Sequence, residues 1–352
     1  MVNASFWKNK RILITGHTGF KGSWLTLLLN ELGAKLFGLS LRQNEKSNLF
    51  FKTKINKLIT NYYGNITNEK LLKEIISHTK PEVIFHLAAQ SLVLKSYEKP
   101  IETIKSNILG SAIVINSFIN SKNPKVLINV TSDKVYKNNN LSNSFVETDE
   151  LGGEDPYSAS KACVEIISNS MAKSFSYNKS ICNVRAGNVI GGGDWSDDRL
   201  IPDIIKSVKN NEELQIRYPN STRPWQFVLD PLIGYLQLAE KAYNDPINYN
   251  GSWNFGPHEK KQYSVNDILE FCKNNFFKHL QYNNLTKINK SEAKYLNVNS
   301  DKAKKTIGWQ NKTSTEDALN MTFEWYLNYL ENNNIEKLCK SQVKDILNKY
   351  EY

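Results

Sequence analysis

The chain has 352 residues, of which 40% are hydrophobic and 23% charged, a composition that suits a soluble globular protein and excludes a disordered one. The net charge of +10 raises the question of a nucleic-acid partner. The lysines are scattered, however, and form no basic helix or known nucleic-acid module. We therefore expect no nucleic-acid partner and attribute the charge to a bias in composition.

The first half of the chain alternates short apolar strands with helices. Strands are predicted from β-branched and aliphatic runs at residues 11–15, 36–41, 83–87 and 125–130. Helices are predicted between them at residues 23–32, 69–79 and 101–120, and the first is expected to end at Gly33. This alternation predicts an α/β fold with a doubly wound, parallel Rossmann sheet.

The second half is less regular. The polar stretch 138–156 is predicted to be a loop, and a helix at 157–174 and a strand at 182–185 follow it. Beyond Asn188, glycines and prolines interrupt the pattern. We predict a dinucleotide-binding domain over residues 1–188, a smaller mixed α/β substrate-binding lobe over 189–330 that can exchange elements with the first domain, and a peripheral C-terminal helix over 331–352.

No targeting or metal-binding signal stands out. The first ten residues lack the apolar core of a signal peptide, and no apolar run has the roughly 18 residues of a membrane span. The cysteines form no CxxC pair and fit neither a zinc site nor a small disulfide framework; they are Cys163, Cys182, Cys272 and Cys339. We expect a cytoplasmic protein with reduced thiols, no membrane association and no metal.

A glycine-rich turn joins the first predicted strand to the first helix. In it Gly16 would allow the tight turn, Gly19 the approach of a pyrophosphate and Gly22 close packing of the helix on the strand. The helix N-terminus would add free N–H groups. The alternative is a glycine-rich turn without a ligand. No acidic residue follows the second strand, where Ser40 and Arg42 stand instead, so this position leaves NAD and NADP both open.

Two further motifs suggest catalysis. Ser132, Asp133 and Lys134 follow the strand at 125–130, and Tyr157 and Lys161 are spaced four apart on the next helix. Lys161 is expected to lower the pKa of Tyr157 toward a value useful for a base. A tyrosine and lysine four apart are common on helices, and Asp133 and Lys134 could also form a surface ion pair. His86 is expected to support a strand end.

These motifs together resemble the extended short-chain dehydrogenase/reductase family. Similar stretches run from about residue 6 to 329, including FHLAAQ at 85–90, RAGNVIGGGDW at 185–195, RPWQ at 223–226 and WNFGP at 253–257. The Ser132-Asp133-Lys134 triplet resembles the CDP-glucose 4,6-dehydratases in particular. Most nucleotide-sugar 4,6-dehydratases carry Thr-Asp-Glu there.

The resemblance implies an NAD-dependent lyase that makes a deoxysugar precursor of surface polysaccharides and acts as a homodimer or homotetramer. Tyr157 would remove the proton of the sugar 4-hydroxyl, to which Ser132 also hydrogen-bonds, and Lys161 would hold the nicotinamide ribose. Lys134 would then remove the C5 proton while Asp133 protonates the departing 6-hydroxyl. This elimination needs Lys134 partly neutral and Asp133 partly protonated, which burial favours.

The resemblance also implies binding residues. For the cofactor these are Gly16, Thr18, Gly19, Phe20, Gly22, Ser40, Arg42, Asn65, Ile66, Leu87, Ala88, Ala89, Asn107, Tyr157 and Lys161. For the substrate, with CDP-glucose favoured, they are Gln90, Lys95, Asn188, Arg199, Arg217 and Arg223. Guanidinium groups suit a diphosphate because they bind phosphate oxygens in a bidentate manner.

The chain departs from the family pattern at four positions. Ser91 and Leu94 replace a proline and an arginine, which leaves Lys95 as the nearby cation and puts the sugar or nucleotide in doubt. Asn65 replaces an aspartate that holds the adenine amino group, and Phe227 replaces a histidine. Two other functions stay open: an epimerase or reductase of a nucleotide sugar, and a dinucleotide sensor without activity.

Overall fold

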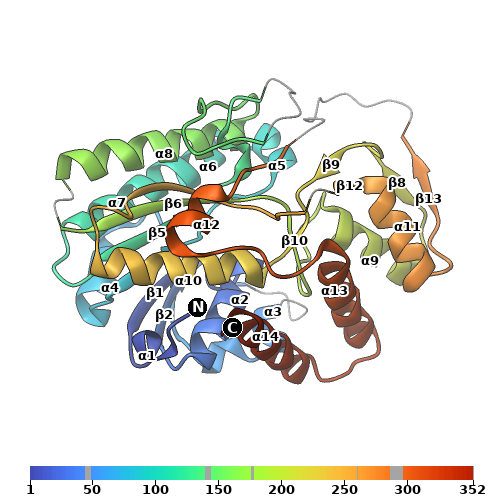
Figure 1. The fold of residues 1–352 in the computed structure, drawn as a ribbon, viewed down its shortest axis with the longest axis horizontal. Coiled ribbons are helices and arrows are strands. Elements are labelled where there is room, and N and C mark those ends of the chain that lie inside the picture. Colours follow the sequence, from blue (N-terminus) through green and yellow to red (C-terminus); the bar gives the residue numbers. More distant parts are fainter. Residues whose placement is uncertain (44–48, 139–143, 176–177, 260, 286–295, 352) are drawn as a thin grey trace.

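The computed structural model describes all residues except 44–48, 139–143, 176–177, 260, 286–295 and 352. Its centre is a seven-stranded sheet in which every paired strand is parallel, in the order β11-β6-β5-β4-β1-β2-β3 (Figure 1). The chain runs outward from β1 in one direction and then from β4 in the other. This is the doubly wound arrangement that the alternation of strands and helices predicted.

The first half-sheet follows the prediction closely. It contains β1 (Arg11–Thr15), α2 (Phe20–Glu31), β2 (Lys35–Ser40) and β3 (Thr60–Tyr63). The strand β3 was not predicted, because its sequence TNYY is polar and carries no apolar run. It pairs with β2 alone at the sheet edge, where one side faces solvent and a polar strand is tolerated.

The second half-sheet and its helices follow between residues 69 and 186. These are α4 (Glu69–Thr79), β4 (Val83–His86), α5 (Val93–Glu98), α6 (Pro100–Ile104), the π-helical turn η2 (Lys105–Leu109), α7 (Gly110–Ile119), β5 (Val126–Val130), the 3-10 turn η3 (Asp133–Val135), α8 (Pro156–Phe175) and β6 (Ser180–Ala186). The long helix predicted at 101–120 is therefore one helical segment with a π-turn in its middle.

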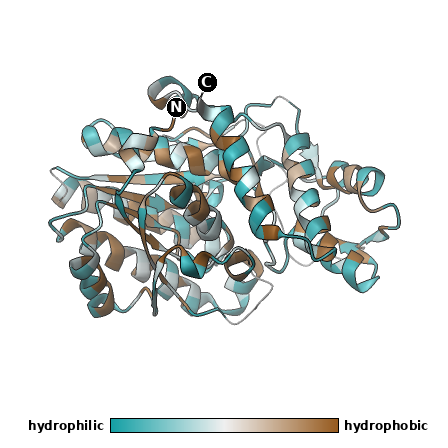
Figure 2. Cartoon of the chain, turned by 90° about the horizontal axis from the view of Figure 1, so that it is seen from below, coloured by the Kyte–Doolittle hydropathy of each residue, from teal (hydrophilic) through white to brown (hydrophobic). Residues whose placement is uncertain are grey.

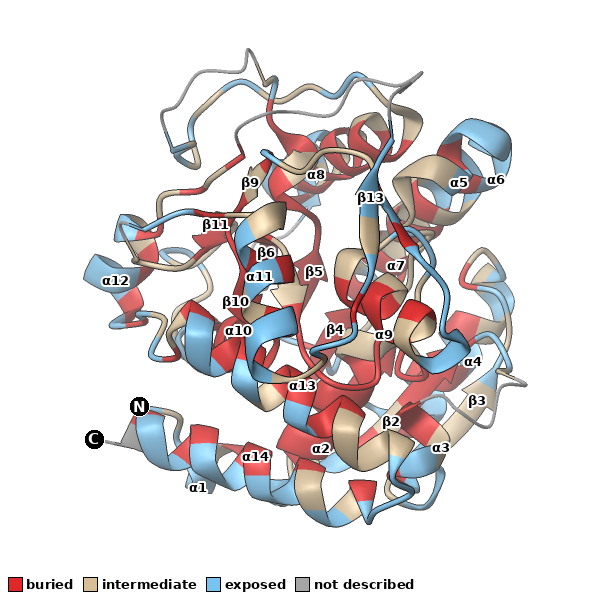
Figure 3. Cartoon of the chain, turned by 90° about the vertical axis from the view of Figure 1, so that its right-hand side faces the viewer, coloured by how far each residue is buried: buried red, intermediate tan, exposed pale blue. Residues whose placement is uncertain are grey.

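Strand alternation divides the core into two layers. Ile12 and Ile14 of β1 face the cluster that includes α2 and α10 (Leu229–Asn244), whereas Leu13 between them faces the cluster formed with α4 and α7. Successive side chains of a strand point to opposite faces, so one strand supplies both clusters. Apolar residues accordingly line the interior and polar residues the outer helix faces (Figure 2), and the central strands are buried (Figure 3).

Residues 189–330, predicted as the substrate-binding lobe, form a smaller lobe and also add elements to the central sheet. The smaller lobe contains α9 (Leu200–Asn210), α11 (Val265–Asn275) and three two-stranded sheets: β7 (Val189–Ile190) with β10 (Gln226–Phe227), β9 (Thr222–Arg223) with β12 (Tyr263–Ser264), and β8 (Leu214–Ile216) with β13 (Tyr282–Asn284). In contrast, α10 packs on β5 and β6, and β11 (Gly251–Phe255) pairs with β6. The domain boundaries stay a prediction, but β11 adds a strand to the central sheet, and α10 covers it, with residues beyond 188.

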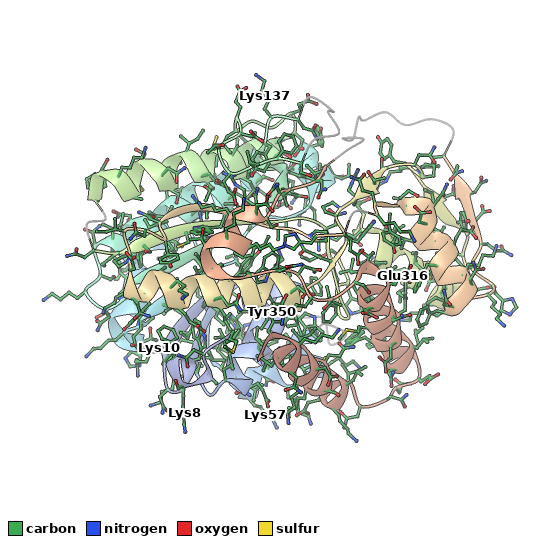
Figure 4. The ribbon with its side chains drawn as sticks, viewed as in Figure 1. Lys8, Lys10, Lys57, Lys137, Glu316 and Tyr350 are labelled. Carbon is green, nitrogen blue, oxygen red and sulfur yellow. The ribbon has the colours of Figure 1, made fainter. Side chains whose placement is uncertain are left out.

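The remaining helices lie around the central sheet (Figure 1). They are α1 (Ala4–Trp7), α3 (Leu49–Lys52), the 3-10 turn η1 (Ile55–Lys57), α12 (Asp301–Ile307), α13 (Thr315–Leu330) and α14 (Ile335–Glu351), of which α14 packs on α2 and α13. Among the described residues, no helix is both long and apolar enough to cross a membrane. Lys8, Lys57 and Lys137 lie at the outer edges, in keeping with scattered surface charge (Figure 4).

One buried ion pair ties the sheet to α8. The Glu165 carboxylate on α8 accepts hydrogen bonds from both Nε and Nη2 of Arg185 on β6, the first at 2.7 Å. It also accepts from Thr131 Oγ1 at 2.6 Å, after β5, and from Ser252 Oγ at 2.8 Å, on β11. Glu165 is completely buried and Arg185 is 1% exposed, so neither charge has water as an alternative partner.

Replacing Glu165 with alanine is expected to lower the free energy of unfolding by about 3–5 kcal/mol, because the Arg185 charge would stay buried without a counter-charge. The control is Glu150→Ala, which removes the exposed pair with Lys137 at 3.0 Å and should cost at most about 1 kcal/mol. Urea denaturation followed by circular dichroism measures both. Equal losses in the two variants would contradict this dependence on the buried pair.

Candidate active site

A cavity of about 1360 Å³ lies at the carboxyl ends of the central strands. Its walls come from the turn after β1, the loops after β2, β4 and β5, the start of α8, and the lobe elements β7, α9 and β8. The chain reverses direction between β1 and β4, and ligands of open parallel sheets bind at such a reversal. The catalytic and binding residues predicted from sequence fall mostly within this cavity.

The glycine-rich turn forms one wall of the cavity, and the chain packs so closely around two of its glycines that a larger residue would clash. Gly16 has a φ of +77°, and a Cβ there would lie 2.8 Å from the Ala88 amide nitrogen. A Cβ at Gly22 would lie 2.2 Å from the Gly16 carbonyl oxygen, so only glycine allows α2 to pack this closely. Gly19 caps α2 without a side-chain hydrogen bond, which leaves the first N–H groups of the helix open to an anion.

These features fit the pyrophosphate of a dinucleotide. Of the predicted cofactor residues, thirteen line the cavity: Gly16, Thr18, Gly19, Phe20, Gly22, Ser40, Asn65, Ile66, Leu87, Ala88, Ala89, Tyr157 and Lys161. Thr18 Oγ1 and Ser40 Oγ are 2.7 Å apart, which joins the turn to the end of β2. Two predicted residues, Arg42 and Asn107, do not line it.

Asn107 and Arg42 have other contacts. The Asn107 side chain accepts from the Gln90 amide at 2.8 Å and donates to the Gln90 carbonyl at 2.9 Å and to Ser160 Oγ at 2.8 Å. It therefore fixes the loop after β4 against α8. The Arg42 guanidinium lies 4.8 Å from the centroid of the Tyr63 ring, a cation–π contact at the edge of the sheet.

The five predicted catalytic residues are all brought to the cavity wall. Ser132 Oγ donates to Asp133 Oδ1 at 3.1 Å, accepts from the Lys134 amide at 3.2 Å, and is hydrogen-bonded to the Tyr157 phenol. Lys161 Nζ donates to the Val130 carbonyl at 3.0 Å. One serine hydroxyl thus connects the strand-end carboxyl group to the tyrosine at the start of α8.

Burial controls the ionisation of the catalytic residues. Burial raises the pKa of Asp133, whereas the nearby charge of Lys134 lowers that pKa by a smaller amount. Burial also lowers the pKa of Lys161 to about 8, although Glu165 one turn further along α8 opposes this change. The raised pKa of Asp133 is the direction that a proton donor requires.

The predicted lowering of the Tyr157 pKa is contradicted. The pKa of Tyr157 is raised, because burial outweighs the hydrogen bond with Ser132, and Lys161 is not among the groups that shift it most. The Lys161 ammonium is directed to the Val130 carbonyl and not to the phenol oxygen. A sequence spacing of four residues puts two side chains on one helix face but does not specify which atom the longer one reaches.

His86 supports the strand end as predicted. Its Nδ1 is 2.6 Å from Thr15 Oγ1 and its Nε2 is 2.9 Å from Ser111 Oγ. Burial lowers the pKa of His86 to about 3, so the ring is neutral and both of its nitrogens are occupied. This histidine therefore has no free nitrogen with which to act as a base.

The predicted substrate residues divide into two sets. Four line the cavity: Asn188, Arg199, Arg217 and Arg223. Arg199 pairs with Asp194 at 2.7 Å and Arg217 with Asp198 at 3.1 Å, and Arg223 donates to the Thr222 carbonyl at 2.7 Å. Gln90 and Lys95 do not line the cavity. The side-chain Nε2 of Gln90 donates to the Leu92 carbonyl and to Thr103 Oγ1, and Lys95 is exposed on α5.

Two features of the site were missed in the sequence. Lys21 lines the cavity and lies inside the glycine-rich turn itself, where only the glycines form a recognisable pattern. Glu165 continues the spacing of Tyr157 and Lys161 by one more turn of α8, a signal that could have identified it. The described residues contain no group of three histidine, cysteine, aspartate or glutamate side chains able to hold a metal ion.

Comparison with known proteins gives the family. The family model described as GDP-mannose 4,6 dehydratase matches residues 13–322. The CDP-glucose 4,6-dehydratase of Salmonella typhimurium is 36% identical over 354 residues, covering 99% of each chain. The dTDP-D-glucose 4,6-dehydratase of Dictyostelium discoideum is 30% identical over 254 residues, covering 66% of this chain and 56% of that one.

Solved structures show the same fold at lower identity. A UDP-glucose 4-epimerase with UDP-glucose from Thermotoga maritima superposes with a TM-score of 0.78 at 23% identity, covering 91% of this chain and 99% of its own. A dTDP-glucose 4,6-dehydratase from Bacillus anthracis in complex with NAD has a TM-score of 0.75 at 20% identity, covering 94% and 99%. The chain belongs to the nucleotide-sugar 4,6-dehydratase family of the extended short-chain dehydrogenase/reductases.

Proposed function

We propose that this protein is a hydro-lyase that converts CDP-glucose to CDP-4-dehydro-6-deoxyglucose and water, with a nicotinamide cofactor that is recycled within each turnover. The observation that carries the proposal is the meeting of two pairs in one cavity. Ser132 and Tyr157 can oxidise an alcohol with a dinucleotide, and Asp133 and Lys134 can expel water beside them. The full-length similarity to a CDP-glucose 4,6-dehydratase supports the choice of sugar nucleotide.

Each chain residue has a defined proton to move. Tyr157 in its phenolate form takes the proton of the 4-hydroxyl, and Ser132 hydrogen-bonds the same oxygen. Burial raises the pKa of Tyr157, so this step is favoured as the pH rises. The bound cofactor would accept the C4 hydride and later return it to C6. Lys134 removes the C5 proton, which the new 4-ketone makes acidic, and Asp133 gives its proton to the departing 6-hydroxyl. Lys134 then returns its proton to C5, and the proton held by Tyr157 passes through the Ser132 hydroxyl to Asp133, which resets both residues.

Asp133 can serve as the acid that protonates the leaving group, because its side chain is buried. A carboxyl group in water is ionised at neutral pH, whereas burial of Asp133 raises its pKa and favours the protonated form. An epimerase would need neither the acid nor the adjacent amine, so this pair favours dehydration over epimerisation.

The cations around the lobe entrance suit a diphosphate. We assign Arg199, Arg217 and Arg223, with Asn188, to the substrate phosphates and sugar. Arg199 and Arg217 each pair with an aspartate. Exchange of the carboxylate partner for a phosphate would keep each guanidinium paired.

We propose NAD as the cofactor. A preference for NADP needs a cation positioned at the ribose 2′-phosphate. Arg42 lies instead on the Tyr63 ring and outside the cavity wall, and the end of β2 presents the Ser40 hydroxyl, held by Thr18. A neutral hydroxyl is compatible with an unphosphorylated ribose.

We also propose a cytoplasmic homodimer, or a tetramer built from such dimers, with a contact through α6, η2 and α8. The support is a group of exposed apolar side chains on these neighbouring helices. Ile101 is 61% exposed, Leu109 50% and Ile166 57%. Exposed apolar patches of this kind are typical of subunit contacts.

The first test is incubation of the purified protein with CDP-glucose and either NAD or NADP, followed by mass spectrometry. We expect a product lighter by one water with NAD, without net formation of reduced cofactor, because the hydride returns to the sugar. UDP-, GDP- and dTDP-glucose serve as comparison substrates. An unchanged mass with all four sugars would contradict dehydration, and a rearranged sugar of equal mass would indicate epimerisation.

Replacing Lys134 with methionine should stop elimination after oxidation. We expect reduced nicotinamide to accumulate in amounts equal to the enzyme, because hydride has left C4 but no C6 acceptor forms. The rate of product formation should fall about 100- to 10,000-fold. The control is Lys57→Met, which changes an exposed lysine outside the cavity wall. Normal turnover by Lys134→Met would remove this residue from the mechanism.

The double variant Ile101→Glu and Leu109→Glu should be monomeric, because two charges would be buried in the subunit contact. Light scattering after size-exclusion chromatography should give a dimer or tetramer mass for the unmodified chain. Ile247→Glu changes a residue that is 76% exposed outside these helices and should leave the mass of the assembly unchanged. A monomeric unmodified chain would refute the proposed assembly.

A further inference from the structure

Lys21 is a cation in the cavity wall that the mechanism above does not use. It is the second residue of α2 and lies between Gly19 and Gly22 in the sequence. Its ammonium is 6.0 Å from the centroid of the buried Tyr235 ring on α10. No hydrogen bond or ion pair joins this ammonium to another residue that the structure describes. Its charge is therefore available to a group that changes its own charge during catalysis.

Asp133 is such a group, and one of its oxygens has no hydrogen-bond partner. Oδ1 accepts from Ser132, whereas Oδ2 is buried without a partner among the described residues. Buried polar atoms without partners are rare in proteins, and such an atom in a cavity suggests a functional role. A carboxylate at this position would carry its charge on an oxygen that only electrostatic attraction can stabilise.

Lys21 and Asp133 line the same cavity, and each charge acts on the pKa of the other. The positive charge of Lys21 opposes the burial that raises the pKa of Asp133. In return, the Asp133 charge opposes the combined effect of burial, Arg199 and Lys161, which lowers the pKa of Lys21 to about 8. Asp133 is the anion that favours the charged form of Lys21.

Other groups also face Asp133, and their roles differ. The cations besides Lys21 are Lys134 and Arg223, and the phenols are those of Tyr157 and Tyr235. Lys134 is the proposed base and changes its own charge during the same step. Arg223 donates to the Thr222 carbonyl and is assigned to the substrate phosphates. Lys21 differs from both, because it is assigned neither a proton transfer nor a phosphate.

We propose that Lys21 stabilises the negative charge left on Asp133 when this residue protonates the departing 6-hydroxyl. The inference rests on the dehydration proposed above. In that step the Asp133 O–H bond breaks and its proton joins the leaving oxygen. The electron pair of the C6–O bond departs with the water, and the electron pair of the C5–H bond forms the double bond between C5 and C6.

Lys21 keeps its own proton throughout and contacts no reacting atom in this scheme. It is therefore a positioning residue that acts through Asp133. A fixed cation placed beside a developing negative charge lowers the energy of the transition state without any reorganisation during the reaction. The glycine-rich turn thus contributes to elimination as well as to cofactor binding.

The sign of the pH effect follows from this role. Removing the Lys21 charge raises the pKa of Asp133, so that the carboxyl group stays protonated up to a higher pH. The alkaline limb of activity, where the acid loses its proton, should therefore move upward. The maximal rate should fall at the same time, because the carboxylate formed in the transition state has lost its counter-charge.

The experiment compares Lys21→Met and Lys21→Arg with the unmodified chain, using CDP-glucose and saturating NAD across the pH range. For Lys21→Met we expect the alkaline limb to move up by about one pH unit and kcat to fall about tenfold. Reduced nicotinamide should accumulate during turnover, since elimination has become slow. Lys21→Arg keeps the charge and should keep the position of the limb.

Lys52→Met is the matched control. Lys52 also lies over an aromatic ring, at 5.1 Å from the centroid of Tyr329, but outside the cavity, and its replacement should change neither quantity. Thermal melting followed by circular dichroism verifies that each variant folds, and Lys21→Gln replaces the methionine variant if that one does not fold.

Two results would overturn the inference. An unchanged alkaline limb in Lys21→Met, together with weaker NAD binding in a fluorescence titration, would make Lys21 a ligand of the cofactor phosphates. A uniform loss of activity at every pH, with no accumulation of reduced nicotinamide, would make its role structural. An unmodified chain that dehydrates no sugar nucleotide would instead reject the proposed function, so the two failures are distinguishable.

Discussion

The Glu165 carboxylate is the contact on which the geometry of the site depends. It holds Arg185 of β6, Thr131 after β5 and Ser252 of β11 from a single position on α8. Thr131 directly precedes Ser132, and Lys161 lies one helical turn before Glu165. The loop that carries the acid and the helix that carries the tyrosine are thus aligned by one buried anion. Its desolvation is offset because every lone pair that faces the interior has a donor.

Positive charge in this protein is of two kinds. Exposed lysines such as Lys8 and Lys57 lie at the molecular edges, where water and salt screen them (Figure 4). Two cations of the cavity, Lys161 and Arg223, are buried, so that water and salt screen their charges less. A sugar nucleotide with a diphosphate is attracted by these interior cations, and the net charge of the whole chain contributes little to that specificity.

Much of the fold and part of the site could be predicted from sequence, for identifiable reasons. Strands such as β1 and β5 are apolar runs between turn residues, and the glycines of the turn after β1 have backbone requirements that other residues cannot meet. The polar edge strand β3 carries no such pattern. The direction of the Lys161 ammonium, the free oxygen of Asp133 and the position of Lys21 depend on contacts between distant segments, which no local pattern encodes.

The position of β11 at the edge of the central sheet has a consequence for the order of folding. Its partner β6 ends at Ala186, and β11 begins at Gly251, so the last parallel pair joins segments with a long stretch of chain between them. During synthesis β6 must wait with an unpaired edge until the later strand leaves the ribosome. An unpaired edge can associate with other chains. Until residue 255 has been synthesised, the β6 edge therefore lacks the partner that covers it in the folded protein.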